Sequence, residues 1–322
     1  MRCLYCLIFI CFLHEIRGTA EHEWEKFKIE YRKSYKTKKD EREHFEHFKE
    51  NLDVINSHNK LYEEGKVTYK KGITKFADLT DEEFVRKYRF DKRSTKIYTD
   101  EPEYELKTEN SSDHFDWREK GAVTKVKNQD TCGACWIFAS VGALEGLYFR
   151  KTNKSIVLSE QNLMDCISNH TCLGGWPGEV FKYIYMGKGI NAEEDYVSNV
   201  KQKRCNYQKS KNVPISFIGA DYVENNEEAL KKALVEYGPI VLCIYAGEKW
   251  KLYKSGVWYE RECSDIPNHA VLLVGYGSEN GHDYWLIKNS HSEDWGEKGY
   301  MKIARNKHRN YCSITRFAIF VK

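Results

Sequence analysis

Residues 128–136 read Asn-Gln-Asp-Thr-Cys-Gly-Ala-Cys-Trp, and an apolar run predicted to be helical, Trp136–Phe149, follows at once. Cys135 therefore stands at the start of a helix, where the positive end of the helix dipole favours a thiolate nucleophile. A zinc site would need a second close Cys or His pair, and a thioredoxin-like redox pair would need a βαβ context. The other cysteines are scattered singly, so a pair of structural cysteines is the alternative to a nucleophile.

A thiolate nucleophile needs a base, and a neutral imidazole needs a partner that orients it. His269 stands at the start of a strand-like run, although a lone histidine in such a place is more often a satisfied core residue. Asn289 follows the next apolar run, at the end of Tyr284–Ile287. These two side chains are the candidates for the base and its orienting amide.

The order of these motifs resembles that of the papain-like cysteine proteases, in their cathepsin L-like branch. His269 and Asn289 lie 134 and 154 residues after Cys135, close to the spacing in papain. Three other motifs fit the same pattern. The start of the mature enzyme resembles Asp116–Gly121, the cleft glycines resemble Cys172–Gly175, and the turn after the asparagine resembles Trp295–Tyr300.

The resemblance implies a role for each matching residue. Cys135 would be the nucleophile, and His269 its general base and then general acid. Asn289 would orient His269, and Gln129 would form the oxyanion hole with the backbone N–H of Cys135. The implied activity is that of a cysteine endopeptidase, and it uses no cofactor and no metal.

The resemblance also implies an α+β fold. A papain-like two-lobed domain, with a helical lobe and an antiparallel β-barrel-like lobe, would follow a helical inhibitory propeptide. The residue patterns agree with this order, since the helices Trp136–Phe149, Glu179–Tyr185 and Asn226–Tyr237 come before most of the strands. The predicted strands are Ile215–Val223, Ile240–Tyr245, His269–Tyr276, Tyr284–Ile287, Tyr300–Ala304 and Phe317–Val321.

The substrate cleft is expected to contain bare glycines and an apolar pocket for the second substrate residue before the cut. The implied substrate-binding residues are Gly133, Gly174, Gly175, Trp176, Pro177, Ala270 and Phe317. Phe317 should shorten the pocket and favour Val, Leu or Pro, unless it is merely a core residue. The implied disulfides are Cys132–Cys172, Cys166–Cys205 and Cys263–Cys312, which leaves Cys243 as a buried, inert thiol.

The N-terminal part divides into two expected segments before the mature domain at 111–322. Residues 1–20 form a signal peptide, because Arg2 precedes the apolar run Leu4–Leu13 and small residues end at Ala20. Residues 21–110 form the propeptide, whose polar linker 91–112 would be cut near Asn110. The expected location is the secretory pathway, either lysosomal or extracellular, and the sequons at Asn153 and Asn169 fit both.

The propeptide carries a helix motif that runs from Asp40 and His44 to Asn59, although Glu and Arg are usual where Asp40 and His44 stand. A second motif covers 72–78, with Thr74 where Asn is usual. The apolar stripes of these helices need a partner surface, so the precursor should be latent. Acid should activate it, because protonation of carboxylates such as Asp78 weakens their native pairings.

Composition excludes several partners. The chain of 322 residues has 51 Lys and Arg against 48 Asp and Glu, which is too small an excess to predict nucleic-acid binding. No apolar run is long enough to span a membrane. The expected partners are peptide or protein substrates, the chain's own propeptide and cystatin-type inhibitors, and the expected state is a monomer.

Three positions depart from the common family pattern near the site, and the first, Ala134 in place of a common Ser, is within the range of the family's signature. Asp130 replaces a usual Gly and is expected to alter the oxyanion loop; His291 replaces a usual Trp and is expected to let water compete for Asn289. The alternative hypotheses are a secreted protease-like binding or scaffold protein with little turnover, and a 21–110 segment that inhibits other proteases on its own.

Overall fold

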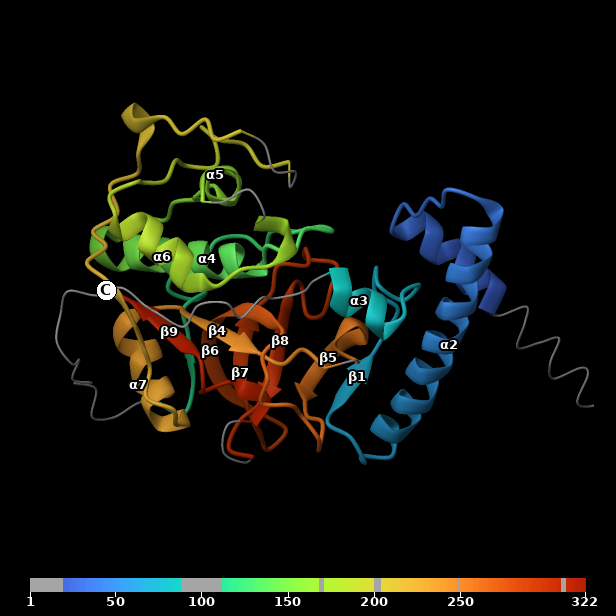
Figure 1. Ribbon diagram of the computed structural model, residues 1–322. Coiled ribbons are helices and arrows are strands. Elements are labelled where there is room, and N and C mark those ends of the chain that lie inside the picture. Colours follow the sequence, from blue (N-terminus) through green and yellow to red (C-terminus); the bar gives the residue numbers. More distant parts are fainter. Residues whose placement is uncertain (1–19, 88–111, 168–170, 200–203, 248, 308–310) are drawn as a thin grey trace, which may run out of the picture.

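The computed structural model describes residues 20–87, 112–167, 171–199, 204–247, 249–307 and 311–322. Figure 1 shows three parts: a helical layer over one side of a β-sheet, the sheet itself, and a helical unit against the far edge of the sheet. The signal, most of the linker and the Asn169 sequon lie outside the described residues.

The helical lobe is built around α4, Cys135–Thr152, which is buried along most of its length. It ends at Asn153, whose φ of 56° is left-handed, a common helix C-terminus. Two shorter helices pack beside it, α5 at Glu160–Cys166 and α6 at Pro177–Tyr185. The patterns predicted α4 and α6 and missed α5, a short helix begun by Ser159, whose side chain accepts from the N–H of Asn162.

The sheet lobe has the strand order β1-β5-β8-β7-β6-β4-β9-β3, with β2 paired to β6. Helix α7, Glu227–Tyr237, packs beside it and begins at the predicted Asn226 cap. The strand bounds are β1 Tyr69–Lys71, β2 Phe115–Asp116, β3 Ala220–Tyr222, β4 Ile240–Ile244, β5 Tyr253–Trp258, β6 His269–Glu279, β7 His282–Lys288, β8 Tyr300–Ala304 and β9 Ala318–Val321. Short 3₁₀ helices in the described parts of the chain are η1 Thr171–Leu173, η2 Lys209–Lys211, η3 Trp250–Leu252 and η4 Tyr311–Ser313.

The α+β expectation is confirmed, but its antiparallel, barrel-like lobe needs correction. The sheet is open, ending at β1 and β3, and β5 pairs with β8 in parallel. The predicted strand Ile215–Val223 shrinks to β3, since residues 215 and 217 make only local backbone bonds to residues 213 and 215. The unpredicted β5 contains Gly256 and mixed polarity, so no period-2 pattern marks it.

The unit at the far edge of the sheet consists of a helix at residues 20–30, α2 at Lys38–Glu63, β1 and α3 at Asp81–Lys87. Its own core gathers Trp24, Phe27, Phe48 and Ile55, apolar residues that recur at helical spacing in the sequence. Leu252 of the following domain completes this cluster. The stripes therefore bury against each other and against the rest of the chain.

Three disulfides stabilise the domain after residue 111, and they are the pairings that the resemblance implies: Cys132–Cys172, Cys166–Cys205 and Cys263–Cys312. Cys135 and Cys243 are unpaired and buried. Cys243 lies in β4, all of whose residues are buried, as expected for an inert thiol. Among the described residues, no helix is both long and apolar enough for a membrane span.

Candidate active site

Cys135 is the first residue of α4, and no side chain caps this helix start. The first N–H groups of a helix have no partner within it, so they stand ready to bind a developing negative charge. The backbone of Ala270, the residue after His269, lies close enough to the Cys135 sulfur to oppose the rise in the pKa of the thiol. The start of α4 and the start of β6 therefore meet, and with them the predicted nucleophile and base.

His269 and Asn289 come together through the pairing of β6 with β7, whose register joins Leu272 to Lys288. His269 Nε2 lies 2.9 Å from Asn289 Oδ1, and both side chains are buried. His269 Nδ1 has no hydrogen-bond partner in the described part of the chain. One ring nitrogen is thus oriented by an amide, and the other remains able to exchange a proton.

Gln129 lies in the loop before Cys132, and its side chain is fully buried. Its Nε2 donates to the carbonyl of Cys132 at 2.8 Å, and its Oε1 accepts from the hydroxyl of Ser290. An amide nitrogen carries two hydrogens, so one remains to serve an oxyanion. Sequence reasoning missed Ser290, and its only signal was its position next to Asn289.

Burial sets the protonation of the central pair. It raises the pKa of the Cys135 thiol to about 12. It also lowers the pKa of His269 to about 4, against the opposing effect of the bond to Asn289. Both groups are therefore neutral at pH 6–7 in this form of the chain. Burial therefore disfavours the ion pair between thiolate and imidazolium that attacks peptides.

The two unusual positions near the site have clear surroundings. Asp130 has a φ of 50°, in the left-handed region that favours glycine, and its N–H donates to Asn128 Oδ1 at 3.2 Å. His291 is fully buried and stacks on His269 with ring centroids 5.3 Å apart. Asn289 is only 3% exposed, so little of its side chain is open to the competing water that the sequence leads us to expect.

Of the predicted substrate-binding residues, Trp176 and Ala270 belong to the same core cluster as Cys135, and Phe317 packs against that cluster. Trp176 and Phe317 meet edge to face with centroids 5.5 Å apart, and Pro177 and Ala270 are buried. Phe317 is half-buried: one part of its ring packs against the core cluster that contains Trp176, and the rest is exposed. The donor N–H of Gly133 is occupied by the carbonyl of Cys172 at 3.0 Å.

Local geometry favours glycine at both 174 and 175, for reasons that the sequence does not show. Gly174 has a φ of 99°, a conformation that favours glycine. A Cβ on Gly175 would lie 2.4 Å from the ring of Trp136. The glycine at 175 is therefore required by the packing of the indole, whether or not a substrate pairs there.

The N-terminal unit attaches to the domain along one side of the site. Strand β1 pairs with β5, and a Cβ on Gly256 would lie 2.7 Å from the carbonyl of Thr68. Thr74, at the position where Asn is usual, donates its hydroxyl to the carbonyl of Lys251 at 2.6 Å. Phe76 and Phe84 lie 5.1 and 6.0 Å from the ring of His291, so this unit covers the histidine that covers His269.

The helix motif of this unit holds the loop at 72–79 by its side chains. Asn51 donates to the carbonyls of Ala77 and Leu79, and Asn59 exchanges two bonds with Lys71. Asp78 is buried and accepts from Lys33 at 2.7 Å. His44, at the usual arginine position, has Nδ1 2.7 Å from the carbonyl of Asp78.

Comparison with known proteins gives consistent matches over nearly the whole chain. Residues 111–322 match the papain family of cysteine proteases, and residues 24–84 match the cathepsin propeptide inhibitor domain. A cathepsin L-like peptidase of Aedes aegypti is 40% identical over 316 residues, 94% of this chain and 93% of that protein. Digestive cysteine proteinase 1 of Homarus americanus is 38% identical over 315 residues, which cover 94% of this chain and 95% of that protein.

A solved structure agrees with the fold of the whole proenzyme. Digestive procathepsin L 3 of Tenebrio molitor larval midgut superposes with a TM-score of 0.86 at 35% identity, over 94% of this chain and 98% of that one. These matches do not favour a protease-like binding protein without turnover. The chain belongs to the papain family of cysteine proteases and is a cathepsin L-like proenzyme that carries its own propeptide inhibitor domain.

Proposed function

We propose that Cys135 attacks the peptide carbonyl while His269 takes the thiol proton through Nδ1. The same imidazole then gives a proton to the leaving amine, and water releases the acyl group. Asn289 holds the ring through Nε2, and the observation that carries the proposal is this 2.9 Å contact, which leaves Nδ1 without another partner in the described site. Gln129 and the N–H of Cys135 stabilise the oxyanion.

Thiol labelling tests these roles. An epoxysuccinyl probe should modify Cys135 in the processed enzyme and leave Cys243, buried in β4, untouched. The unprocessed chain should react far more slowly, because burial raises the pKa of the thiol well above its ordinary value and leaves little thiolate at pH 6. Labelling of the processed enzyme at another residue, or equal labelling of both forms, would contradict the assignment.

A substitution series separates the supporting residues. Gln129→Ala should lower kcat by about 100-fold to 1000-fold, as for loss of an oxyanion donor. Asn289→Ala should cost about twofold to tenfold, since it removes one hydrogen bond worth about 0.5–1.5 kcal/mol. Gln208→Ala is the matched control, because this half-exposed side chain lies outside the site. A kcat of Gln129→Ala equal to that of the control would remove Gln129 from the mechanism.

The proposed boundaries are a signal at 1–20, a propeptide at 21–110 and a mature enzyme at 111–322. They are supported by the leader pattern and by the positions of the two family matches. The signal directs the chain to the secretory pathway, and the enzyme acts in a lysosome or outside the cell. N-terminal sequencing of the active form should give a start within 108–114, and a start far from these residues would contradict the boundary.

The proposed substrates are peptides and proteins with a small or branched apolar residue at the second position before the cut. Support comes from the apolar walls of Trp176, Pro177 and Ala270, and from Phe317, whose ring meets Trp176. Burying an unpaired charge there would cost several kcal/mol. A peptide-library profile should prefer Val, Leu or Pro, and a preference for Phe or Arg would contradict this pocket. Cystatin-type proteins are the proposed external inhibitors of the open cleft.

A further inference from the structure

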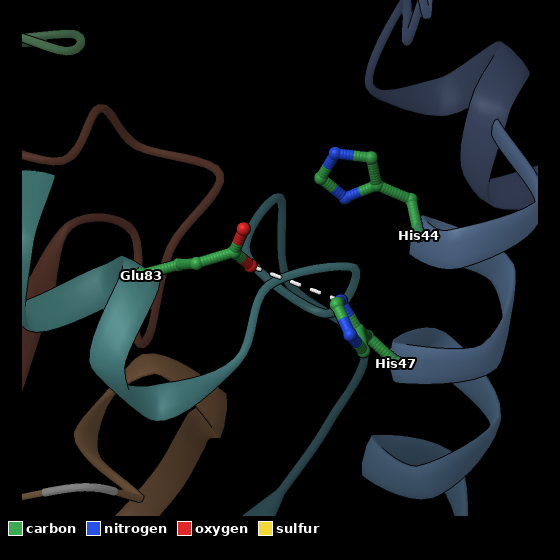
Figure 2. A group of neighbouring side chains, drawn as sticks. All are labelled: His44, His47 and Glu83. Carbon is green, nitrogen blue, oxygen red and sulfur yellow. Dashed lines mark ion pairs between the residues drawn. The ribbon is translucent and has the colours of Figure 1, made fainter. Parts of the chain in front are cut away.

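Three potential metal ligands meet inside the propeptide, away from the catalytic site. His44 and His47 stand one turn apart on the same face of α2, and Glu83 reaches toward them from α3 (Figure 2). One ligand atom from each side chain lies within 4.8 Å of the other two. The three side chains are partly buried, with 18%, 28% and 28% exposure.

His47 is not satisfied by its neighbours. Its Nδ1 is buried and makes no hydrogen bond within the described residues. The facing Glu83 Oε2 is 3.8 Å away, which suits an ion pair with a charged imidazole but is too long for a hydrogen bond (Figure 2). A buried polar nitrogen that is left without a bond is costly, so this atom needs a proton and a closer carboxylate, or a cation.

His44 is arranged to present a nitrogen toward the same point. Its Nε2 lies 3.6 Å from Asp40 Oδ1, one turn back along α2, so Nδ1 is the nitrogen on the side of His47. Binding at Nδ1 places the ring proton on Nε2, where Asp40 supplies the carboxylate partner common for metal-bound imidazoles. In the present state Nδ1 donates to the carbonyl oxygen of Asp78 at 2.7 Å, so a bound cation would replace the proton of this hydrogen bond.

The charges nearby also favour a cation. Glu83 and Asp40 bring two carboxylates, whereas the nearby Lys33 is engaged by Asp78 at 2.7 Å. Two imidazoles and a carboxylate are a donor set typical of zinc. With Zn–ligand distances of about 2.0–2.1 Å, a tetrahedral site separates ligand atoms by about 3.4 Å, so the 3.8 Å between His47 and Glu83 must close by only a few tenths of an ångström.

We propose that His44, His47 and Glu83 form a binding site for a divalent transition-metal cation of the zinc class, within the propeptide. The site would join α2 to α3, two elements that no disulfide links among the described residues. Helix α3 also contacts the enzyme, through Asp81 to Lys251 at 2.6 Å and through Phe84 to His291. A bound cation therefore stabilises the latent form, in proportion to its occupancy.

A binding measurement on the unprocessed chain tests the site. The Cys135→Ala proenzyme cannot process itself and lacks the catalytic thiol, which is itself a zinc ligand. Calorimetric titration with Zn²⁺ at neutral pH should show one tight site, and Co²⁺ should give the absorption spectrum of a nitrogen- and oxygen-liganded ion. His47→Gln should weaken Zn²⁺ binding by about 100-fold or more, whereas His22→Gln, an exposed histidine of the same unit, should leave it unchanged.

Glu83→Gln provides a second variant, which removes the carboxylate ligand and leaves both histidines in place. Glu83 also accepts a hydrogen bond from the N–H of Thr80, so the fold of this variant must be checked. With circular dichroism confirming a folded chain, it should weaken binding like His47→Gln. Zn²⁺ should also raise the thermal midpoint of the Cys135→Ala proenzyme and not that of its His47→Gln form. Absence of tight binding, or equal affinity in the His47, Glu83 and His22 variants, would overturn the proposal. These measurements use no turnover, so they stand apart from the catalytic assignments.

Discussion

The ring of His291 lies nearly parallel to that of His269, with an angle of 15° between their planes. Burial and the neighbouring His269 hold the pKa of His291 well below its ordinary value, so it stays neutral. During attack on a substrate, His269 must become an imidazolium. A neutral imidazole covers that cation less well than an indole, whose face attracts cations more strongly. His291 is therefore expected to give a working but slower site.

The substitution His291→Trp in the processed enzyme should raise kcat/KM by about twofold to tenfold, which corresponds to a gain of about 0.5–1.5 kcal/mol from the attraction between the indole face and the imidazolium. The alkaline limit of activity should also move upward, because a better covered imidazolium keeps its proton longer. The measurement is kcat/KM across pH on one peptide, with His282→Trp, at the far end of β7, as control. An unchanged rate and pH limit would make His291 a neutral replacement.

At the scale of elements, the propeptide is held by short contacts between α3 and η3. Lys251 of η3 is 2% exposed, and its ammonium donates to the carbonyl of Leu79 and to Asp81, both at 2.6 Å. These charged hydrogen bonds exist only while the propeptide is bound. They join the propeptide, near the start of α3, to the enzyme beside Trp250. The ring of Trp250 lies edge-on to that of His269, with ring centroids 6.1 Å apart.

Lys251→Met should therefore weaken latency without altering the protease fold. Loss of the charged bonds is expected to cost about 1.5–3 kcal/mol, so the open form should become about tenfold to 100-fold more populated. Its population can be followed by the rate at which a thiol probe labels Cys135 in the unprocessed chain at neutral pH. Lys249→Met changes an exposed neighbour and should label at the original rate. If both variants label alike, the contact contributes nothing to latency.

At the scale of the whole molecule, closure of the propeptide is linked to protons. His269 has a pKa of about 4 in the closed form because it is buried, against about 6.5 for an exposed imidazole. We expect the opened form to bind a proton between these values that the closed form does not, because release of Phe76 and Phe84 uncovers His291, which stacks on His269. The free energy by which His269 favours the closed form is thus fully present above about pH 6.5. It falls as the pH falls toward 4, and the total loss is about 3 kcal/mol at most.

Acid should accordingly open the proenzyme, and His269 should supply part of the effect. The Cys135→Ala chain should become more susceptible to limited proteolysis of the propeptide as pH falls from 6.5 to 4. Adding His269→Gln should flatten this pH dependence, because an amide does not titrate in this range. An identical pH profile with and without His269→Gln would exclude the linkage.

The sequence by itself determined the family, the three disulfide partners and the helix that begins at Cys135. Those features are encoded locally or in the order of motifs: apolar periodicity, an Asn226 cap, and cysteines at family spacing. The roles of Cys135, His269, Asn289 and Gln129 remain predictions, which the arrangement of their side chains supports.

Only the tertiary structure decided the remaining features. The stack of His291 on His269, the bond from Ser290 to Gln129 and the clash that requires Gly175 depend on strand register and packing between distant segments. The open sheet with a parallel β5–β8 pair, and its extension by β1 of the propeptide, likewise have no local signature. Sequence patterns report which face of an element is apolar, whereas these contacts depend on which other element covers that face.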